Sequence, residues 1–71
     1  MKPEIVIFNG HRKLARPTGF LYGSQALMLC PGEHPGQLAL IAPADAKNPE
    51  RLFAFGTRNE LLAMAASCAR P

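Results

Sequence analysis

The strongest local constraint on the fold lies near the C-terminal end, where Thr57 is followed three residues later by Glu60. This spacing is a capping box, in which the threonine hydroxyl accepts from the amide of residue 60 and the glutamate carboxylate accepts from the amide of residue 57. It predicts a helix from about Arg58 to Cys68. One narrow apolar stripe at helical spacing is expected to face a core, formed by Leu61, Met64, Ala65 and Cys68.

A short strand is predicted immediately before this helix. Residues 52–55 are all apolar and are flanked by the charged pair Glu50-Arg51 and by Gly56, which fits a strand covered on both faces. Simple alternation places Phe53 and Phe55 on one face and the other two side chains on the opposite face. Only one face can meet the helix that follows, so we expect the other to need a second layer or a partner molecule.

Seven prolines and six glycines divide the chain into short pieces, which favours strands. Residues 4–8 run into Asn9-Gly10, which favours a type I′ hairpin turn because both central residues need positive φ. The two-residue turn pairs Phe8 with His11 and Ile5 with Leu14. Residues 16–19, which include Pro17, predict a bend or bulge in the returning strand before a further extended piece at residues 20–22.

A second hairpin is predicted from two apolar runs, residues 25–30 and 37–42, which flank a six-residue loop rich in proline and glycine. Ser24 leaves an alternative open, because it could also cap a single helical turn through Leu29. Residues 43–50 form a polar connection on the surface. The predicted fold is therefore a single α+β domain over residues 1–71, a small antiparallel sheet of four to five strands with one C-terminal helix packed on one face.

Composition and length restrict the cellular compartment and the oligomeric state that we expect for the protein. Two cysteines are too few for a disulfide scaffold, no secretory signal pattern opens the chain, and no apolar run approaches the roughly 20 residues of a membrane helix. We therefore expect a cytoplasmic protein that does not enter a membrane. A chain of 71 residues buries only about 60% of its unfolded surface, so its core is marginal and a homodimer or a bound partner is expected to help.

Catalytic and metal chemistry have weak support. Cys30, Glu33 and His34 lie within five residues and could form an activated thiol, but the sequence has no Gly-rich phosphate loop and no paired acidic motif. Cys30 and His34 could also bind zinc with Cys68 and His11, yet structural zinc sites usually contain two close ligand pairs. We expect no enzymatic activity, no metal and no cofactor, with Cys30 packed as a small core residue.

Two hypotheses for function remain. The net charge of +3 comes from the first 16 residues, which contain four basic residues and one acidic residue. The rest of the chain contains four basic and four acidic residues and has no net charge. This basic hairpin, with nearby aromatic rings, supports a weak nucleic-acid binder. The surplus of apolar strand faces supports the leading hypothesis, a protein-interaction module, adaptor or inhibitor of the size of many phage and plasmid accessory proteins. The predicted partner-binding residues are Arg12, Lys13, Arg16, Phe20, Tyr22, Arg51, Phe53 and Phe55.

Overall fold

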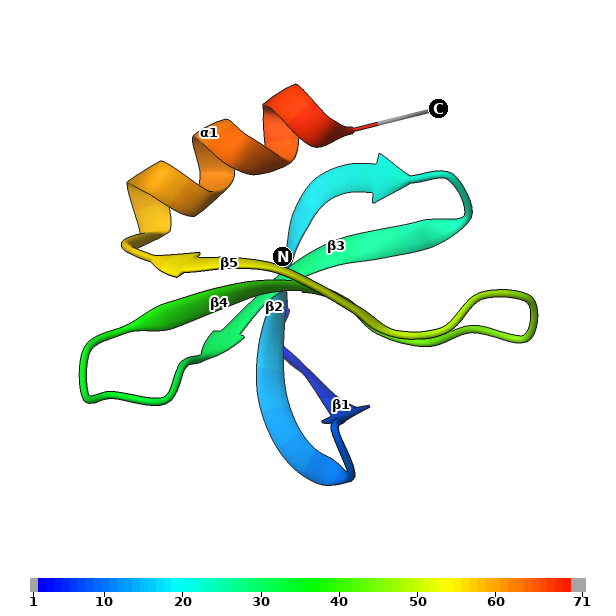
Figure 1. Cartoon of the computed structure of the whole chain (residues 1–71), viewed down its shortest axis with the longest axis horizontal. Helices are drawn as coiled ribbons and strands as arrows, with labels where there is room; N and C mark the ends of the chain where they lie inside the picture. The colour runs from blue at the N-terminus through cyan, green and yellow to red at the C-terminus, as the bar shows by residue number, and fades with distance from the viewer. Residues whose placement is uncertain (1, 70–71) are drawn as a thin grey trace.

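The structure, a computed structural model, describes residues 2–69. In this part of the chain five strands form one antiparallel sheet whose order follows the sequence, and one helix packs on it (Figure 1). The elements are β1 (Glu4–Phe8), β2 (His11–Tyr22), β3 (Gln25–Pro31), β4 (Leu38–Ala42), β5 (Arg51–Gly56) and α1 (Arg58–Cys68). The predicted α+β fold is confirmed, and residues 25–30 are a strand and not a helical turn.

The capping box determines where α1 begins. The amide of Glu60 donates to Thr57 Oγ1 at 3.3 Å, and the amide of Thr57 donates to Glu60 Oε1 at 3.1 Å. The hydrogen bond from the Thr57 amide, followed by a side-chain hydrogen bond from Thr57, lowers the pKa of the Glu60 carboxyl. Leu61 and Ala65 are buried as predicted, but Met64 is 38% exposed and Leu62 packs against the core instead. The predicted stripe is wrong at Met64, because the sheet lies on the Leu62 side of the helix.

The N-terminal hairpin has the predicted turn and register. Asn9 and Gly10 have φ values of 53° and 78°, as a type I′ turn requires. Phe8 pairs with His11 and Ile5 with Leu14. The local sequence was sufficient here because a two-residue turn determines which residues of the two strands lie opposite each other.

A bend in the middle of β2 determines where this hairpin goes. The pairing of β2 with β3 shifts register between Pro17 and Leu21, and Gly19 has a φ of 89°. Within the bulge, Thr18 Oγ1 donates to the carbonyl of Leu27 at 2.8 Å and accepts from the amide of Phe20 at 3.1 Å, so a side chain replaces ladder bonds. The first half of β2 therefore turns away from the helix and carries β1 with it (Figure 1).

The sheet has a hydrophobic core on each face. Alternate residues of β3 point to opposite faces, so Leu27 and Leu29 meet the helix while Met28 and Cys30 face the other side. The helix-side core consists of Leu27, Leu29, Leu40, Ala42, Leu61 and Ala65. The opposite core consists of Ala15, Met28, Cys30, Ala39 and Ile41, with Val6 and Phe8 packed against it. The chain's own hairpin thus covers part of this face, while Leu52 and Phe55 of β5 remain 47% and 41% exposed on it.

A second bulge changes the alternation in β5. Ala54 lies opposite Leu40 and Leu52 lies opposite Ile41, so Phe53 is an extra residue on this strand. Phe53 packs on the helix-side core, whereas Phe55 pairs with Ala39 on the opposite face. The prediction that Phe53 and Phe55 share a face is wrong, because the inserted residue interrupts the alternation of side chains between the two faces of the strand.

A buried glutamine forms hydrogen bonds with the connection between β4 and β5. The Gln25 side chain is 3% exposed, and its Nε2 donates to the carbonyl of Pro49 at 2.7 Å and to that of Pro43 at 3.4 Å. Within the connection Asp45 accepts from the amides of Lys47 and Asn48, and these hydrogen bonds, with one from a serine hydroxyl, lower the pKa of its carboxyl. The loop before β5 is therefore held in place at both ends.

Candidate interaction surface

The two faces of the N-terminal hairpin differ in their surroundings. The inner face, which includes Val6 and Phe8, packs against the sheet. The opposite face, here called the hairpin face, is formed by Ile5, Ile7, Arg12, Leu14 and Arg16. Three of these side chains are the most exposed large hydrophobic residues in the described part of the chain, with Ile5 at 64%, Ile7 at 55% and Leu14 at 51%.

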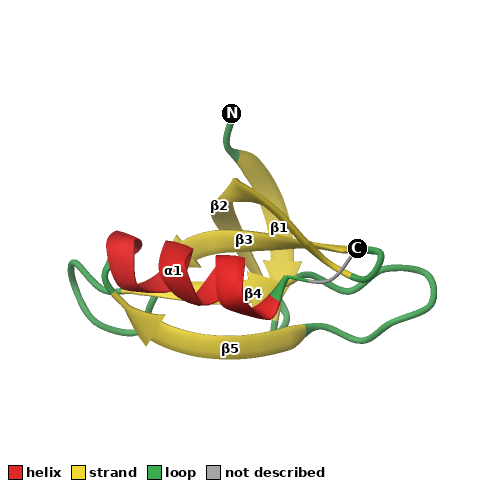
Figure 2. Cartoon of the chain, turned by 90° about the horizontal axis from the view of Figure 1, so that it is seen from above, coloured by secondary structure: helices red, strands yellow, loops and turns green. Residues whose placement is uncertain are grey.

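The hairpin face continues the sheet face that α1 covers. Arg16 pairs with Leu29, which belongs to the helix-side core, so both residues lie on the same face of the sheet. Figure 2 shows α1 lying over the sheet while the β1–β2 hairpin extends beyond it. An 11-residue helix is about 16 Å long and cannot cover five strands, one of which bends away. The apolar side chains beyond its reach remain exposed.

A groove separates α1 from the hairpin face. It has a volume of about 630 Å³ and is here called the helix groove. Its walls come from β2, from the adjoining ends of β3 and β4, and from the first half of α1, and they are mainly aliphatic: Leu14, Pro17, Leu29, Cys30, Pro31, Leu38 and Leu62. Arg16, Thr18 and Arg58 complete the lining, so the polar groups include two cations and no carboxylate.

Three arginines in this region have no ionic partner among the described residues. Arg12, Arg16 and Arg58 are exposed, and within residues 2–69 none of their guanidinium groups forms a hydrogen bond or an ion pair. Lys13 differs, since its Nζ donates to the carbonyl of Pro31 at 3.3 Å. The charged groups best placed to meet a ligand are therefore the guanidinium groups around the helix groove.

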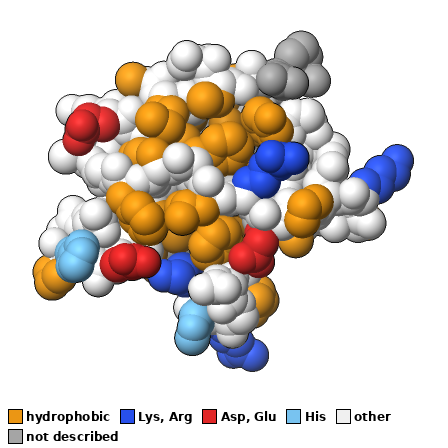
Figure 3. Space-filling model, viewed as in Figure 1, with side chains coloured by type: hydrophobic (Ala, Val, Ile, Leu, Met, Phe, Trp, Pro, Cys, Tyr) orange, Lys and Arg blue, Asp and Glu red, His pale blue; other side chains and the backbone are white. Residues whose placement is uncertain are grey.

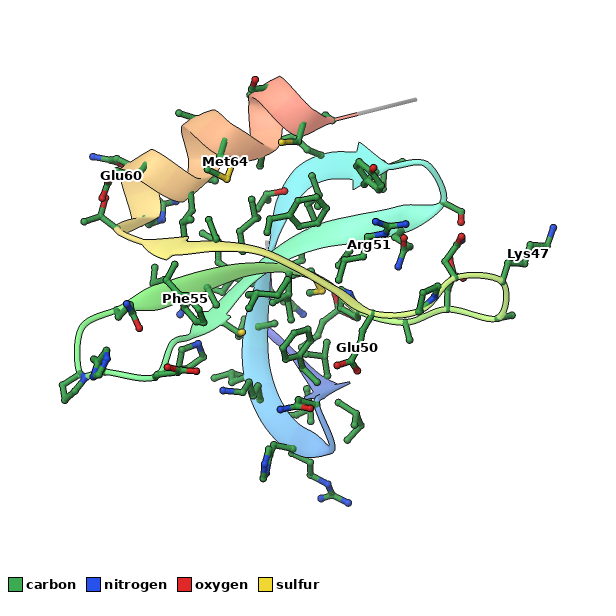
Figure 4. All side chains as sticks on the ribbon, viewed as in Figure 1. Lys47, Glu50, Arg51, Phe55, Glu60 and Met64 are labelled. Atoms are coloured by element: carbon green, nitrogen blue, oxygen red, sulfur yellow. The ribbon has the colours of Figure 1, made fainter. Side chains whose placement is uncertain are left out.

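A second, smaller groove lies between the inner face of the hairpin and β5. It has a volume of about 260 Å³, and Phe8, Leu52 and Phe55 form its apolar part. The amide of Asn9 donates to Glu50 Oε2 at 2.8 Å and holds the hairpin turn beside the start of β5. Figure 3 shows hydrophobic side chains gathered between β5 and the hairpin, and Figure 4 shows Phe55 and Glu50 on this side of β5.

The predicted partner-binding residues do not form one surface. Arg12 and Arg16 belong to the hairpin face, whereas Lys13 and Phe55 line the smaller groove. Phe20 is 37% exposed in the second half of β2 and lines neither groove. The predicted site is thus divided by the alternation of β2, which sends neighbouring basic residues to opposite faces.

The remaining three predicted residues, Tyr22, Arg51 and Phe53, form a stack near the start of β5. The rings of Tyr22 and Phe53 meet edge to face with centroids 5.3 Å apart, and the Arg51 guanidinium lies 5.5 Å from the centre of the tyrosine ring. Both rings pack on the helix-side core. These contacts join β2 to β5 and hold both rings against the helix-side core.

The predicted partner-binding residues do not include four residues of the surface, namely Ile5, Ile7, Leu14 and Arg58. The signal for the first three was present, because the correctly predicted register places them on one face of the hairpin. What the sequence did not show was which of the two hairpin faces packs on the sheet. No sequence pattern identified Arg58 as a residue of this surface, since its position beside β2 depends on how α1 crosses the sheet.

Of the residues considered for catalysis and metal binding, Cys30 lines the helix groove, whereas Glu33, His34, His11 and Cys68 do not. Cys30 is 2% exposed, and burial raises the pKa of its thiol, with a smaller opposing effect from the charge of Lys13. The amides of Glu33 and His34 both donate to Gln37 Oε1, at 3.0 and 3.3 Å, within a tight loop. In residues 2–69 no three histidine, cysteine, aspartate or glutamate side chains lie close enough to hold a metal ion.

Comparison with protein-family models, with curated proteins and with solved structures finds no match. Over the described residues, none of the helical structure is long and apolar enough to cross a bilayer.

Proposed function

We propose that the protein is a small, non-enzymatic interaction module that docks on another protein through the hairpin face and the adjoining helix groove. The observation that carries the proposal is that the three most exposed large hydrophobic residues, Ile5, Ile7 and Leu14, share one face with arginines that lack partners in the described chain. Exposed apolar side chains gathered on one face mark protein-binding sites, and arginine is enriched at such interfaces.

Burial of Ile5, Ile7 and Leu14 would stabilise a complex. Fully burying an isoleucine or leucine side chain is worth about 1.5–3 kcal/mol, and these three keep more than half of their surface exposed. Covering them would add several kcal/mol of favourable burial that the isolated chain does not use. A partner that covers the hairpin face gains this free energy, less the cost of association.

A foreign protein fits the surface better than a second copy. Two hairpin faces docked on each other would bring Arg12 and Arg16 of both copies together without carboxylates on that face. Like charges at an interface disfavour association. The homodimer hypothesis is therefore less well supported than a heteromeric complex.

The nucleic-acid hypothesis gains little support from the geometry. Arg12 lies among aliphatic side chains, Lys13 points to the opposite face, and Phe20 lies on a separate part of β2. Binding of single strands needs cations and stacking rings on the same surface. The arrangement supports a protein partner.

Site-specific photocrosslinking in the native host tests the proposal. A photoreactive residue at position 7 is expected to give one dominant protein adduct, whereas the same group at position 21 is not. Leu21 is a suitable control because it is 49% exposed and lines neither groove. Ile7→Ser should abolish capture of that protein by the tagged full-length chain, while Leu21→Ser should leave it unchanged. Equal capture by both variants would contradict the proposal.

A further inference from the structure

We infer, building on the proposed function, that the docking segment of the partner is acidic as well as apolar. Its apolar side chains enter the helix groove, and its carboxylates meet Arg16 and Arg58. The inference deepens the proposal above by naming the chemistry of the partner.

The two arginines of the helix groove come from different elements of the fold. Arg16 belongs to β2 and Arg58 to the first turn of α1, yet both line the same groove. A guanidinium group presents planar donors that match a carboxylate, and both guanidinium groups are without partners in the described residues. A peptide lying in the groove could therefore be held by carboxylate pairs through two separate elements.

The charge around the helix groove is positive. The lining of the groove contains two arginines and neither aspartate nor glutamate. Arg12 on the hairpin face adds a third positive charge, and the N-terminal end of α1 contributes a partial positive charge. Glu60, the acidic residue of that turn, does not line the groove and is engaged by the amide of Thr57. Electrostatic complementarity favours an acidic partner.

The aliphatic walls of the groove distinguish a peptide from other acidic ligands. Leu14, Leu29, Leu38 and Leu62 line the groove, and no aromatic ring does. A nucleic-acid strand would find no stacking surface there. The site is a concave groove that fits individual side chains, whereas a lipid headgroup surface is broad. Aliphatic walls between two arginines suit a segment that alternates apolar and acidic residues.

Selection from a displayed library of random 16-residue peptides on the immobilised full-length protein tests the inference. The enriched sequences are expected to carry net negative charge together with leucine, isoleucine, methionine or phenylalanine. Synthetic peptides made from them should bind the parent protein, and their affinity should fall as salt rises. The double variant Arg16→Glu, Arg58→Glu should lose at least tenfold in affinity.

Two controls make the result specific to the groove. The double variant Lys2→Glu, Lys47→Glu changes the net charge by the same amount at exposed positions outside the groove, and it should keep most of the affinity. Figure 4 shows Lys47 pointing away from the body of the protein. Replacing the acidic residues of a selected peptide with lysine should restore binding to the Arg16→Glu, Arg58→Glu variant. Circular dichroism and urea unfolding establish that each variant is folded.

Several outcomes would overturn the inference: enrichment of neutral or basic peptides, acidic peptides that bind both double variants equally, or no peptide that depends on the two arginines. A 16-nucleotide single strand or phosphatidylserine vesicles that bind through these arginines, without any such peptide, would identify a different ligand and also overturn it. If these tests fail while crosslinking from position 7 succeeds, the acidic partner is wrong and the proposed function stands. If crosslinking fails, the proposed function itself is wrong.

Discussion

Thr57 shows how much one side chain contributes to this fold. Its hydroxyl accepts from the Glu60 amide, which otherwise has no partner at the end of the helix. Thr57→Ala should therefore lower the free energy of unfolding by about 1 kcal/mol. Urea unfolding followed by circular dichroism measures the change. Thr57→Ser keeps the hydroxyl and should unfold close to the parent midpoint, so an equal midpoint for the alanine variant would show that the cap is not needed.

At the scale of elements, the bend in β2 decides what the hairpin contacts. Gly19 has a φ of 89°, which residues with a β-carbon rarely adopt, so Gly19→Ala should cost about 1–3 kcal/mol of stability. The bend directs β1 onto the sheet, so amide hydrogen exchange should also accelerate in β1 more than in β4. Both quantities can be measured on the same sample.

A matched glycine provides the control for this experiment. Gly23 has a φ of 63°, and a β-carbon added there meets nothing within 4 Å. Asparagine tolerates this left-handed region, so Gly23→Asn should change stability less than Gly19→Ala. Equal effects of the two substitutions would mean that the bend has no special role.

At the scale of the whole molecule, one face of the N-terminal hairpin packs on the core and the other is exposed. Phe8 packs on the core opposite the helix, whereas Ile5 is 64% exposed on the hairpin face. Phe8→Ala should lower stability by about 2 kcal/mol, since a half-buried phenylalanine loses part of the 3–5 kcal/mol of a fully buried one. Ile5→Thr keeps the β-branched shape and should change stability by less than about 1 kcal/mol. Denaturant unfolding of both variants checks this difference.

The same pair of variants separates stability from binding. Ile5→Thr should weaken capture of the partner although the protein remains folded, because the side chain contributes to the hairpin face. A larger loss of stability from Ile5→Thr than from Phe8→Ala would show that the inner and outer faces have been assigned the wrong way round.

The sequence by itself determined the elements whose causes are local. The capping box defined the start of α1, and Asn9-Gly10 defined the first turn and the register of β1 with β2. These features involve residues within a few positions of each other, so their hydrogen bonds and backbone angles can be inferred from residue types alone. The candidate arginines Arg12 and Arg16 were also identified at this level, as part of a basic N-terminal segment.

Tertiary structure alone decided which faces are covered. The bulge that makes Phe53 an extra residue in β5 sends Phe55 to the other face, and it depends on pairing with β4. The bend in β2 was predicted, but the direction in which it turns the hairpin depends on packing against β3 and β4. The helix groove exists only because α1 packs beside β2, so that Arg58 of α1 and Arg16 of β2 line the same space. Such contacts join residues far apart in the chain. The free energy gained by burying apolar surface between them is non-directional, so no local sequence pattern shows which residues will meet.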